Sequence, residues 1–175
     1  MKKTWIEETP EVFYTGKPVS TVSQDEIEML KKIAVSSPRR QARLCTHLNT
    51  TDAVHEMIIV HSRGNYVRPH RHMGKIESFH VVEGRLNVML FEDDGRIRSV
   101  IRMAGYGSGK IFYYRLSKPL FHTVVPVSDM VVFHEITNGP FNPSENCFAP
   151  WSPDENDSRA ASFQRELLIK SKDHS

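Results

Sequence analysis

The sequence predicts an all-β fold, an antiparallel sandwich or barrel, with one helix near the N-terminus and a helical tail at the C-terminus. Two observations support this fold class. Short β-prone runs follow one another closely, which disfavours a βαβ sheet, and turn signals separate them. One of these signals is Glu92-Asp-Asp-Gly95, which is typical of a hairpin because Asp-Gly tolerates positive φ. The expected strands cover residues 42–48, 55–62, 65–72, 76–83, 85–92, 96–102, 109–115, 121–127 and 130–137.

The N-terminal part is expected to form an arm and a helix. Residues 1–22 show no sustained periodicity and are interpreted as an arm or an added edge strand. Ser23-Gln-Asp-Glu26 is a capping-box pattern that predicts the start of a helix. The helix should end at Ser36-Ser-Pro38, because the residue before a proline disfavours helical angles. Its buried face would carry Ile27, Leu30, Ile33 and Ala34.

The C-terminal part is expected to be a loop and a second helix. Residues 139–157 are rich in Pro, Asn and Ser, and Asp157 or Ser158 could cap a helix that carries Ala160, Phe163 and Leu167 on one stripe. We therefore expect one domain in three parts. An arm and helix occupy residues 1–40, a barrel 41–140, and a loop and helix 141–175.

Composition excludes several classes of protein. Charged residues make up 25% and hydrophobic residues 39% of the 175 residues, as in ordinary globular chains. The formal net charge of +2 is too small to favour nucleic acid, and no apolar run is long enough to span a membrane. Without an apparent secretion signal, we expect a cytoplasmic protein in which Cys45 and Cys147 remain thiols.

A candidate metal centre lies near the middle of the chain. His70 and His72 are two residues apart, so both imidazoles should project from the same face of a strand. A turn at Met73-Gly74 would let a hairpin bring Glu77 to them. His122, on a later β-prone run, is the candidate fourth ligand. Mixed nitrogen and oxygen donors suit one divalent iron, manganese, nickel or zinc ion.

These residues also carry a resemblance to a known family. The spacing G-x5-H-x-H-x4-E-x6-G matches the first cupin motif at Gly64, His70, His72, Glu77 and Gly84. The second cupin motif is matched only at His122, since Pro119 is displaced, the usual glycine is missing and Pro126 replaces the usual asparagine.

More narrowly, the chain resembles the WbuC family of cupin-fold metalloproteins over roughly residues 25–155. The resembling stretches are 37–47, 66–72, 77–84, 122–126, 133–140 and 148–153. The resemblance implies a cupin or jelly-roll barrel and a metal site. It also implies a connection with bacterial surface-polysaccharide (O-antigen) biosynthesis.

Several other residues are candidates for contact with a substrate. Tyr66 and Arg68 share strand parity with His70, so a regular strand would direct both into the cavity. Together with Glu135, they are candidates for orientation or acid–base catalysis. Arg68 could also bind an anionic group of the substrate. His80 and His134 are out of phase with their neighbours and should face away from the site.

A basic cluster is the remaining substrate-binding candidate. Arg39, Arg40 and Arg43 lie between the first helix and the next strand, and guanidinium groups suit a diphosphate. A solvated basic turn would explain the same residues.

These features predict metal-assisted isomerase or epimerase chemistry on a sugar or nucleotide sugar. The reaction type follows from the resemblance. The alternatives are a non-catalytic carbohydrate-binding or regulatory cupin and, third, an iron-dependent dioxygenase. The expected partners are a small polar substrate and a second copy of the chain in a homodimer, because an open barrel leaves sheet edges to cover.

Overall fold

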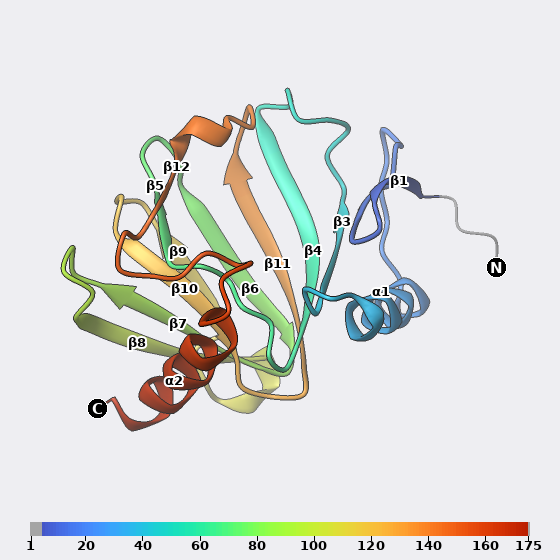
Figure 1. Cartoon of the computed structure of the whole chain (residues 1–175). Helices are drawn as coiled ribbons and strands as arrows, with labels where there is room; N and C mark the ends of the chain where they lie inside the picture. Colours follow the sequence, from blue (N-terminus) through green and yellow to red (C-terminus); the bar gives the residue numbers. More distant parts are fainter. Residues whose placement is uncertain (1–4, 175) are drawn as a thin grey trace.

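The computed structural model describes residues 5–174, so residues 1–4 of the expected arm and residue 175 lie outside the described part. The fold is mostly β, with two sheets and two helices, which confirms the predicted class at this level (Figure 1). Helix α1 covers Gln24–Ser36 and helix α2 covers Ala160–Asp173. Neither of these two helices combines the length and the hydropathy that crossing a membrane requires.

The larger sheet has seven strands in the order β1-β2-β3-β4-β11-β6-β9. Its strands are β1 Ile6–Thr9, β2 Val12–Tyr14, β3 Gln41–Cys45, β4 Val54–Ser62, β11 Met130–Asn138, β6 Glu77–Glu83 and β9 Tyr113–Leu116. The smaller sheet has five strands in the order β12-β5-β10-β7-β8. Its strands are β12 Asn146–Phe148, β5 His70–His72, β10 Phe121–Pro126, β7 Arg85–Phe91 and β8 Ile97–Ala104. Neighbouring strands are antiparallel, apart from the parallel pair β2 and β3.

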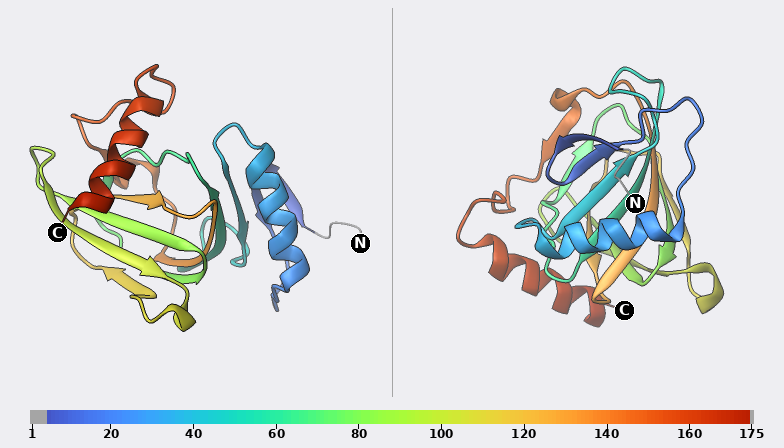
Figure 2. Two further views of the ribbon diagram at one scale, coloured as in Figure 1. Left: turned by 90° about the horizontal axis from the view of Figure 1, so that it is seen from below. Right: turned by 90° about the vertical axis from the view of Figure 1, so that its right-hand side faces the viewer.

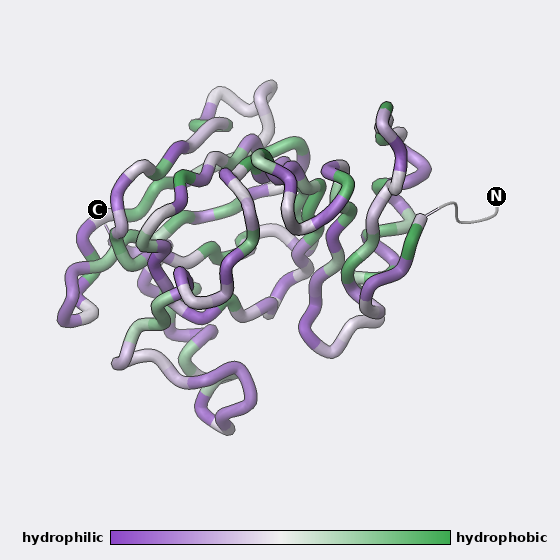
Figure 3. The backbone as a smooth tube through the Cα atoms, turned by 90° about the horizontal axis from the view of Figure 1, so that it is seen from above, coloured by the Kyte–Doolittle hydropathy of each residue, from purple (hydrophilic) through white to green (hydrophobic). Residues whose placement is uncertain are grey.

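The two sheets lie between the two helices (Figure 2). Strand alternation explains this layering, because successive side chains of a strand point to opposite faces. On β3, Ala42 and Leu44 pack against α1, whereas Arg43 and Cys45 face the space between the sheets. The outer face of the smaller sheet packs against α2 through Phe121 and Leu167. The peripheral loops are largely hydrophilic (Figure 3).

The predicted start and end of the first helix are confirmed. The Glu26 carboxylate accepts a hydrogen bond from the backbone N–H of Ser23 at 2.7 Å, as the capping box predicts. Leu30 and Ala34 are buried on its inner face, and the helix ends at Ser36. The second helix begins later than expected, because Arg159 rather than Asp157 or Ser158 occupies the N-cap position.

One predicted strand is much shorter in the structure. The sequence predicts a strand over 65–72, but β5 contains only His70–His72. Pro69 has no N–H to donate to a ladder, and the carbonyl groups around it have other partners. The Val67 carbonyl accepts from the Thr123 hydroxyl at 2.6 Å, and that of Pro69 accepts from the Ala149 N–H at 2.8 Å. The regular alternation assumed for this segment is therefore wrong.

β1 and β2 extend one edge of the larger sheet, which agrees with the added edge strand that was one interpretation of residues 1–22. β12 was not predicted, because it lies within the segment expected to be a loop. The turn from β6 to β7 depends on Gly84, which has φ of 83°. A Cβ atom there would overlap the Met130 carbonyl oxygen, so the fold requires glycine at this last position of the first cupin motif.

Candidate metal centre

Three histidines converge on the inner face of the smaller sheet. His70 and His72 lie on β5, and His122 lies on β10 directly opposite His70 in the antiparallel register. One ring nitrogen from each histidine lies within 4.8 Å of those of the other two. The convergence expected from the spacing of these residues is therefore present in the structure.

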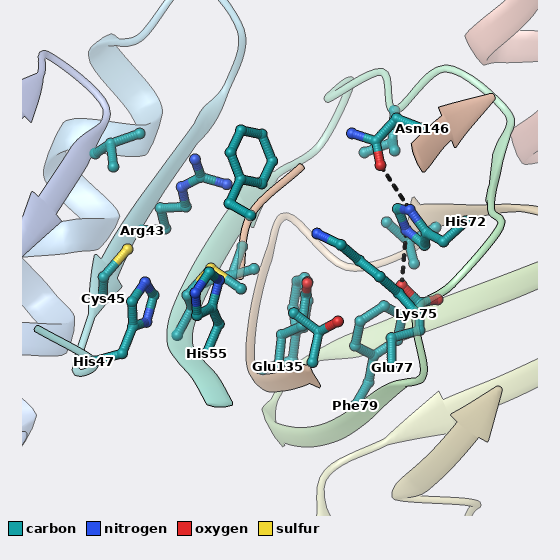
Figure 4. Close-up of a pocket in the computed structure, with 18 of the residues that line it drawn as sticks. Arg43, Cys45, His47, His55, His72, Lys75, Glu77, Phe79, Glu135 and Asn146 are labelled. Atoms are coloured by element: carbon teal, nitrogen blue, oxygen red, sulfur yellow. Dashed lines mark hydrogen bonds and ion pairs between the residues drawn. The ribbon is translucent and has the colours of Figure 1, made fainter. Parts of the chain in front are cut away.

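Hydrogen bonds fix the orientation of all three rings. Nδ1 of His70 lies 2.8 Å from the Arg68 carbonyl oxygen, and Nδ1 of His122 lies 2.9 Å from that of Leu120. Nδ1 of His72 lies 2.7 Å from Oδ1 of Asn146 (Figure 4). Because each partner is an oxygen acceptor, each Nδ1 carries the proton and donates. Every Nε2 is then available as a ligand, an arrangement that is common around metal-binding histidines.

Glu77 supplies the carboxylate of the cluster. It lies at the start of β6 and is only 4% exposed. Its Oε2 is 3.4 Å from Nε2 of His72, and its Oε1 is 2.8 Å from Nε2 of His122. The shorter pair is not aligned as a hydrogen bond, so both buried atoms lack a hydrogen-bond partner among residues 5–174.

The electrostatics of this cluster favour a cation. Burial opposes ionisation of Glu77, but electrostatic attraction to the neighbouring imidazoles, above all that of His122, outweighs it and holds the Glu77 pKa well below its usual range. Burial also opposes protonation of His122, and attraction to Glu77 outweighs it and raises the His122 pKa. Burial, with repulsion from His122, lowers the pKa of His70 to about 3. One carboxylate thus faces imidazoles, at least one of which is neutral at pH 7.

These residues fit a divalent metal ion. They offer three imidazole nitrogens and a carboxylate oxygen, which suit zinc, iron, manganese or nickel. The misaligned pair of Glu77 Oε1 and His122 Nε2 leaves two buried polar atoms that a cation would satisfy.

The cluster lines a cavity of about 400 Å³ between the two sheets. The inner face of the larger sheet contributes Arg43, Cys45, His61, Phe133 and Glu135 to its wall. Burial raises the pKa of Cys45 to about 11, so this thiol is protonated at neutral pH. Cys45 and Cys147 are not bridged, which confirms the expectation of two thiols.

Glu135 is the acidic side chain of the opposite wall. It lies on β11, between Met57 of β4 and Phe79 of β6 in the strand register. Burial and repulsion from Glu77 raise its pKa to about 7. Among the three residues predicted to orient the substrate or to transfer protons, Glu135 lines the cavity (Figure 4).

The predicted direction of Tyr66 and Arg68 is wrong. The Tyr66 hydroxyl donates to the Pro153 carbonyl at 2.9 Å, and its ring packs edge-on against Phe163 of α2. The Arg68 guanidinium is 2.9 Å from the Asp154 carboxylate and covers the Phe148 ring. Because the strand is interrupted at Pro69, Val67 rather than its two neighbours lines the cavity.

The three arginines expected to form a basic cluster do not share one site. Arg39 pairs with Glu155 at 2.8 Å, and Arg40 is exposed with a positive φ of 57°. Neither contributes to the wall of the cavity, whereas Arg43 does. His80 and His134 lie opposite each other on β6 and β11 and are absent from the cavity lining, as predicted.

Several cavity residues were not identified from the sequence. They include Asn146, Lys75, His47, His55 and His61. Asn146 contacts His72 from a strand predicted to be a loop, so no local pattern could identify it. His55 and His61 are an even number of residues apart on β4, a parity that could have placed both on the inner face.

The contact between Asn146 and His72 can be tested directly. Asn146→Ala removes the acceptor that orients the His72 ring, so metal affinity should fall about 10- to 100-fold. Competition with a metal-binding dye would measure the change. Asn142→Ala in the neighbouring turn is the matched control and should leave affinity unaltered. Equal affinities of Asn146→Ala and wild type would contradict the role of Asn146.

Comparison with known protein sequences identifies one matching family model. A family model described as a domain of unknown function (DUF6016) matches residues 22–103, just under half of the chain. No curated protein sequence is significantly similar to this chain.

The similar solved structures are cupin-fold proteins. Bacillus subtilis oxalate decarboxylase, studied for its Mn(II) centres, is 16% identical over 55% of this chain and 24% of its own, with a TM-score of 0.44. CapF, solved with the inhibitor 3-isopropenyl-tropolone, is 19% identical over 62% of this chain and 30% of its own, with a TM-score of 0.48. The Schizosaccharomyces pombe Cnp3 cupin domain is 11% identical over 57% of this chain and 64% of its own, with a TM-score of 0.44. The chain thus spans less than two thirds of each of these proteins.

Proposed function

We propose that this protein is a cupin-type metalloenzyme that binds one divalent metal ion through His70, His72, Glu77 and His122. The observation that carries the proposal is the arrangement of the three imidazoles. Each donates Nδ1–H to an oxygen acceptor and so presents Nε2 to the centre, beside a buried carboxylate. A divalent ion bound there would act as a Lewis acid on a carbonyl or hydroxyl oxygen.

The side chains around the centre suit proton transfer on a small polar ligand. Glu135 lines the wall opposite the histidines and can hold or accept a proton at a ligand in the cavity. A volume of about 400 Å³ is near the lower end of the usual range for ligand sites, roughly 300–1,000 Å³. It therefore favours a ligand the size of a single sugar, with any nucleotide part outside.

We therefore favour isomerisation or epimerisation of a sugar or nucleotide sugar. The chemistry is supported by the pairing of a metal centre with an acid–base group across one cavity. The setting in bacterial surface-polysaccharide synthesis is supported by the sequence resemblance to the WbuC family. We also propose that the protein is cytoplasmic and forms a homodimer.

Metal analysis followed by a substrate screen would test this function. Protein purified without chelator or nickel resin should contain close to one divalent ion per chain. Incubation with keto sugars and nucleotide sugars in D₂O should then incorporate deuterium into one of them, detected by mass spectrometry. Turnover should stop after chelation and return with one particular ion. A ligand that binds and is recovered without deuterium would instead indicate a binding protein.

A further inference from the structure

Arg43 is a cation in the cavity wall that has no hydrogen-bonding or ion-pairing side chain among the described residues. Among residues 5–174, its guanidinium group has neither an ion pair nor a hydrogen bond, although it carries five N–H donors. Nearby arginines differ in this respect, since Arg39 pairs with Glu155 at 2.8 Å and Arg68 with Asp154 at 2.9 Å. The donors of Arg43 are therefore available to a ligand.

The strand register directs Arg43 into the cavity. It lies on β3 opposite Ile59 of β4, and both side chains line the space between the sheets. Burial raises the pKa values of Cys45 and Glu135, and the charge of Arg43 opposes both rises. The guanidinium group therefore lies within electrostatic range of the cavity interior. It is also exposed, so a ligand can reach it from solvent.

Lys75 adds a second cation from the other side of the cavity. It lies in the turn between β5 and β6, and its ammonium group is 4.9 Å from the centre of the Phe141 ring. In Figure 4 its side chain extends away from Glu77 toward the side where Arg43 and His55 lie. Among the described residues, no carboxylate forms an ion pair with Lys75 or Arg43.

We propose that the ligand of the metal centre carries a carboxylate or a phosphate group that binds the Arg43 guanidinium, with Lys75 as the second cationic contact. This inference rests on the proposed function, because it names the substrate class of the same site. A planar guanidinium group can form two parallel hydrogen bonds with either oxyanion. The uncharged end of the ligand would then face the imidazoles and Glu135.

The simplest probes are inorganic phosphate and acetate, titrated into the purified protein at constant ionic strength with chloride as the reference. Backbone amide signals of Arg43 and Cys45 in ¹H–¹⁵N NMR spectra should shift and saturate with at least one of the two anions. Arg43→Gln should weaken this binding about 10- to 100-fold, because it removes a charge-assisted hydrogen-bond pair. Arg43→Lys should restore only part of it. The tighter-binding anion shows whether the ligand carries a phosphate or a carboxylate.

Arg39→Gln is the matched control, because Arg39 is a near neighbour whose guanidinium already pairs with Glu155. It should leave anion binding unchanged. Two results overturn the inference: neither anion saturates, or Arg43→Gln binds as tightly as wild type. Metal content, measured on the same samples, separates the two proposals. Full metal occupancy without anion binding refutes only this inference, whereas Arg43-dependent anion binding without bound metal refutes only the proposed function.

Discussion

Replacing His72 with alanine is expected to remove most of the bound metal. His72 is one of four donors, and Asn146 orients its ring. Loss of a residue that only orients a ligand costs about 10- to 100-fold in affinity, so loss of the ligand itself should cost more than about 100-fold. Elemental analysis of wild type and His72→Ala, purified side by side, would measure the change.

His80→Ala is the matched control for this experiment. His80 lies on β6, is exposed and contacts Phe112 outside the cavity, so its loss should leave metal content unaltered. Wild-type occupancy should also decline below about pH 6, because protons then compete with the metal for imidazole nitrogens. Near-full occupancy in His72→Ala would show that the ligand assignment is wrong.

The ligand cluster could be predicted because its spacing is mostly local. Strand alternation alone predicts that His70 and His72 project from one face, and the short turn after them is enough to bring Glu77 close. His122 is more distant, but it lies on a β-prone run that pairs with β5. The capping box of α1 is equally local, and its predicted hydrogen bond is present.

The opposite wall could not be predicted, because it depends on which distant strands pair. Asn146 reaches His72 only because β12 pairs with β5, a contact between segments 74 residues apart. The prediction for Arg68 failed for a local reason, since it extended regular alternation through Pro69. Once the larger sheet is known, alternation along β3 and β11 places Arg43 and Glu135 on the inner face.

The second large expected effect is on folding stability at acidic pH, which should depend on His61. Its side chain is 5% exposed and packs edge-on against Phe133, and its Nδ1 has no hydrogen-bond partner in the described part of the chain. Burial, together with repulsion from Arg39 and Arg43, lowers the His61 pKa from 6.5 to about 3. In the folded protein His61 therefore remains neutral at pH values below about 6.5, at which the same side chain in the unfolded chain is protonated. The stability contributed by neutral His61 is complete above that pH and is lost progressively as the pH falls toward 3.

We expect His61→Leu to reduce the loss of stability between pH 8 and pH 5 by about 2 kcal/mol, at roughly 1.4 kcal/mol per pH unit below 6.5. Urea unfolding of both proteins at both pH values would measure this, with chelator present so that metal release plays no part. Comparing the pH difference within each protein cancels any change in packing that the substitution causes. The control His80→Leu alters an exposed histidine and should retain the wild-type difference. If His61→Leu also retained it, the acid sensitivity would have to arise from other groups whose pKa is lowered on folding, such as His55, His70 and His134.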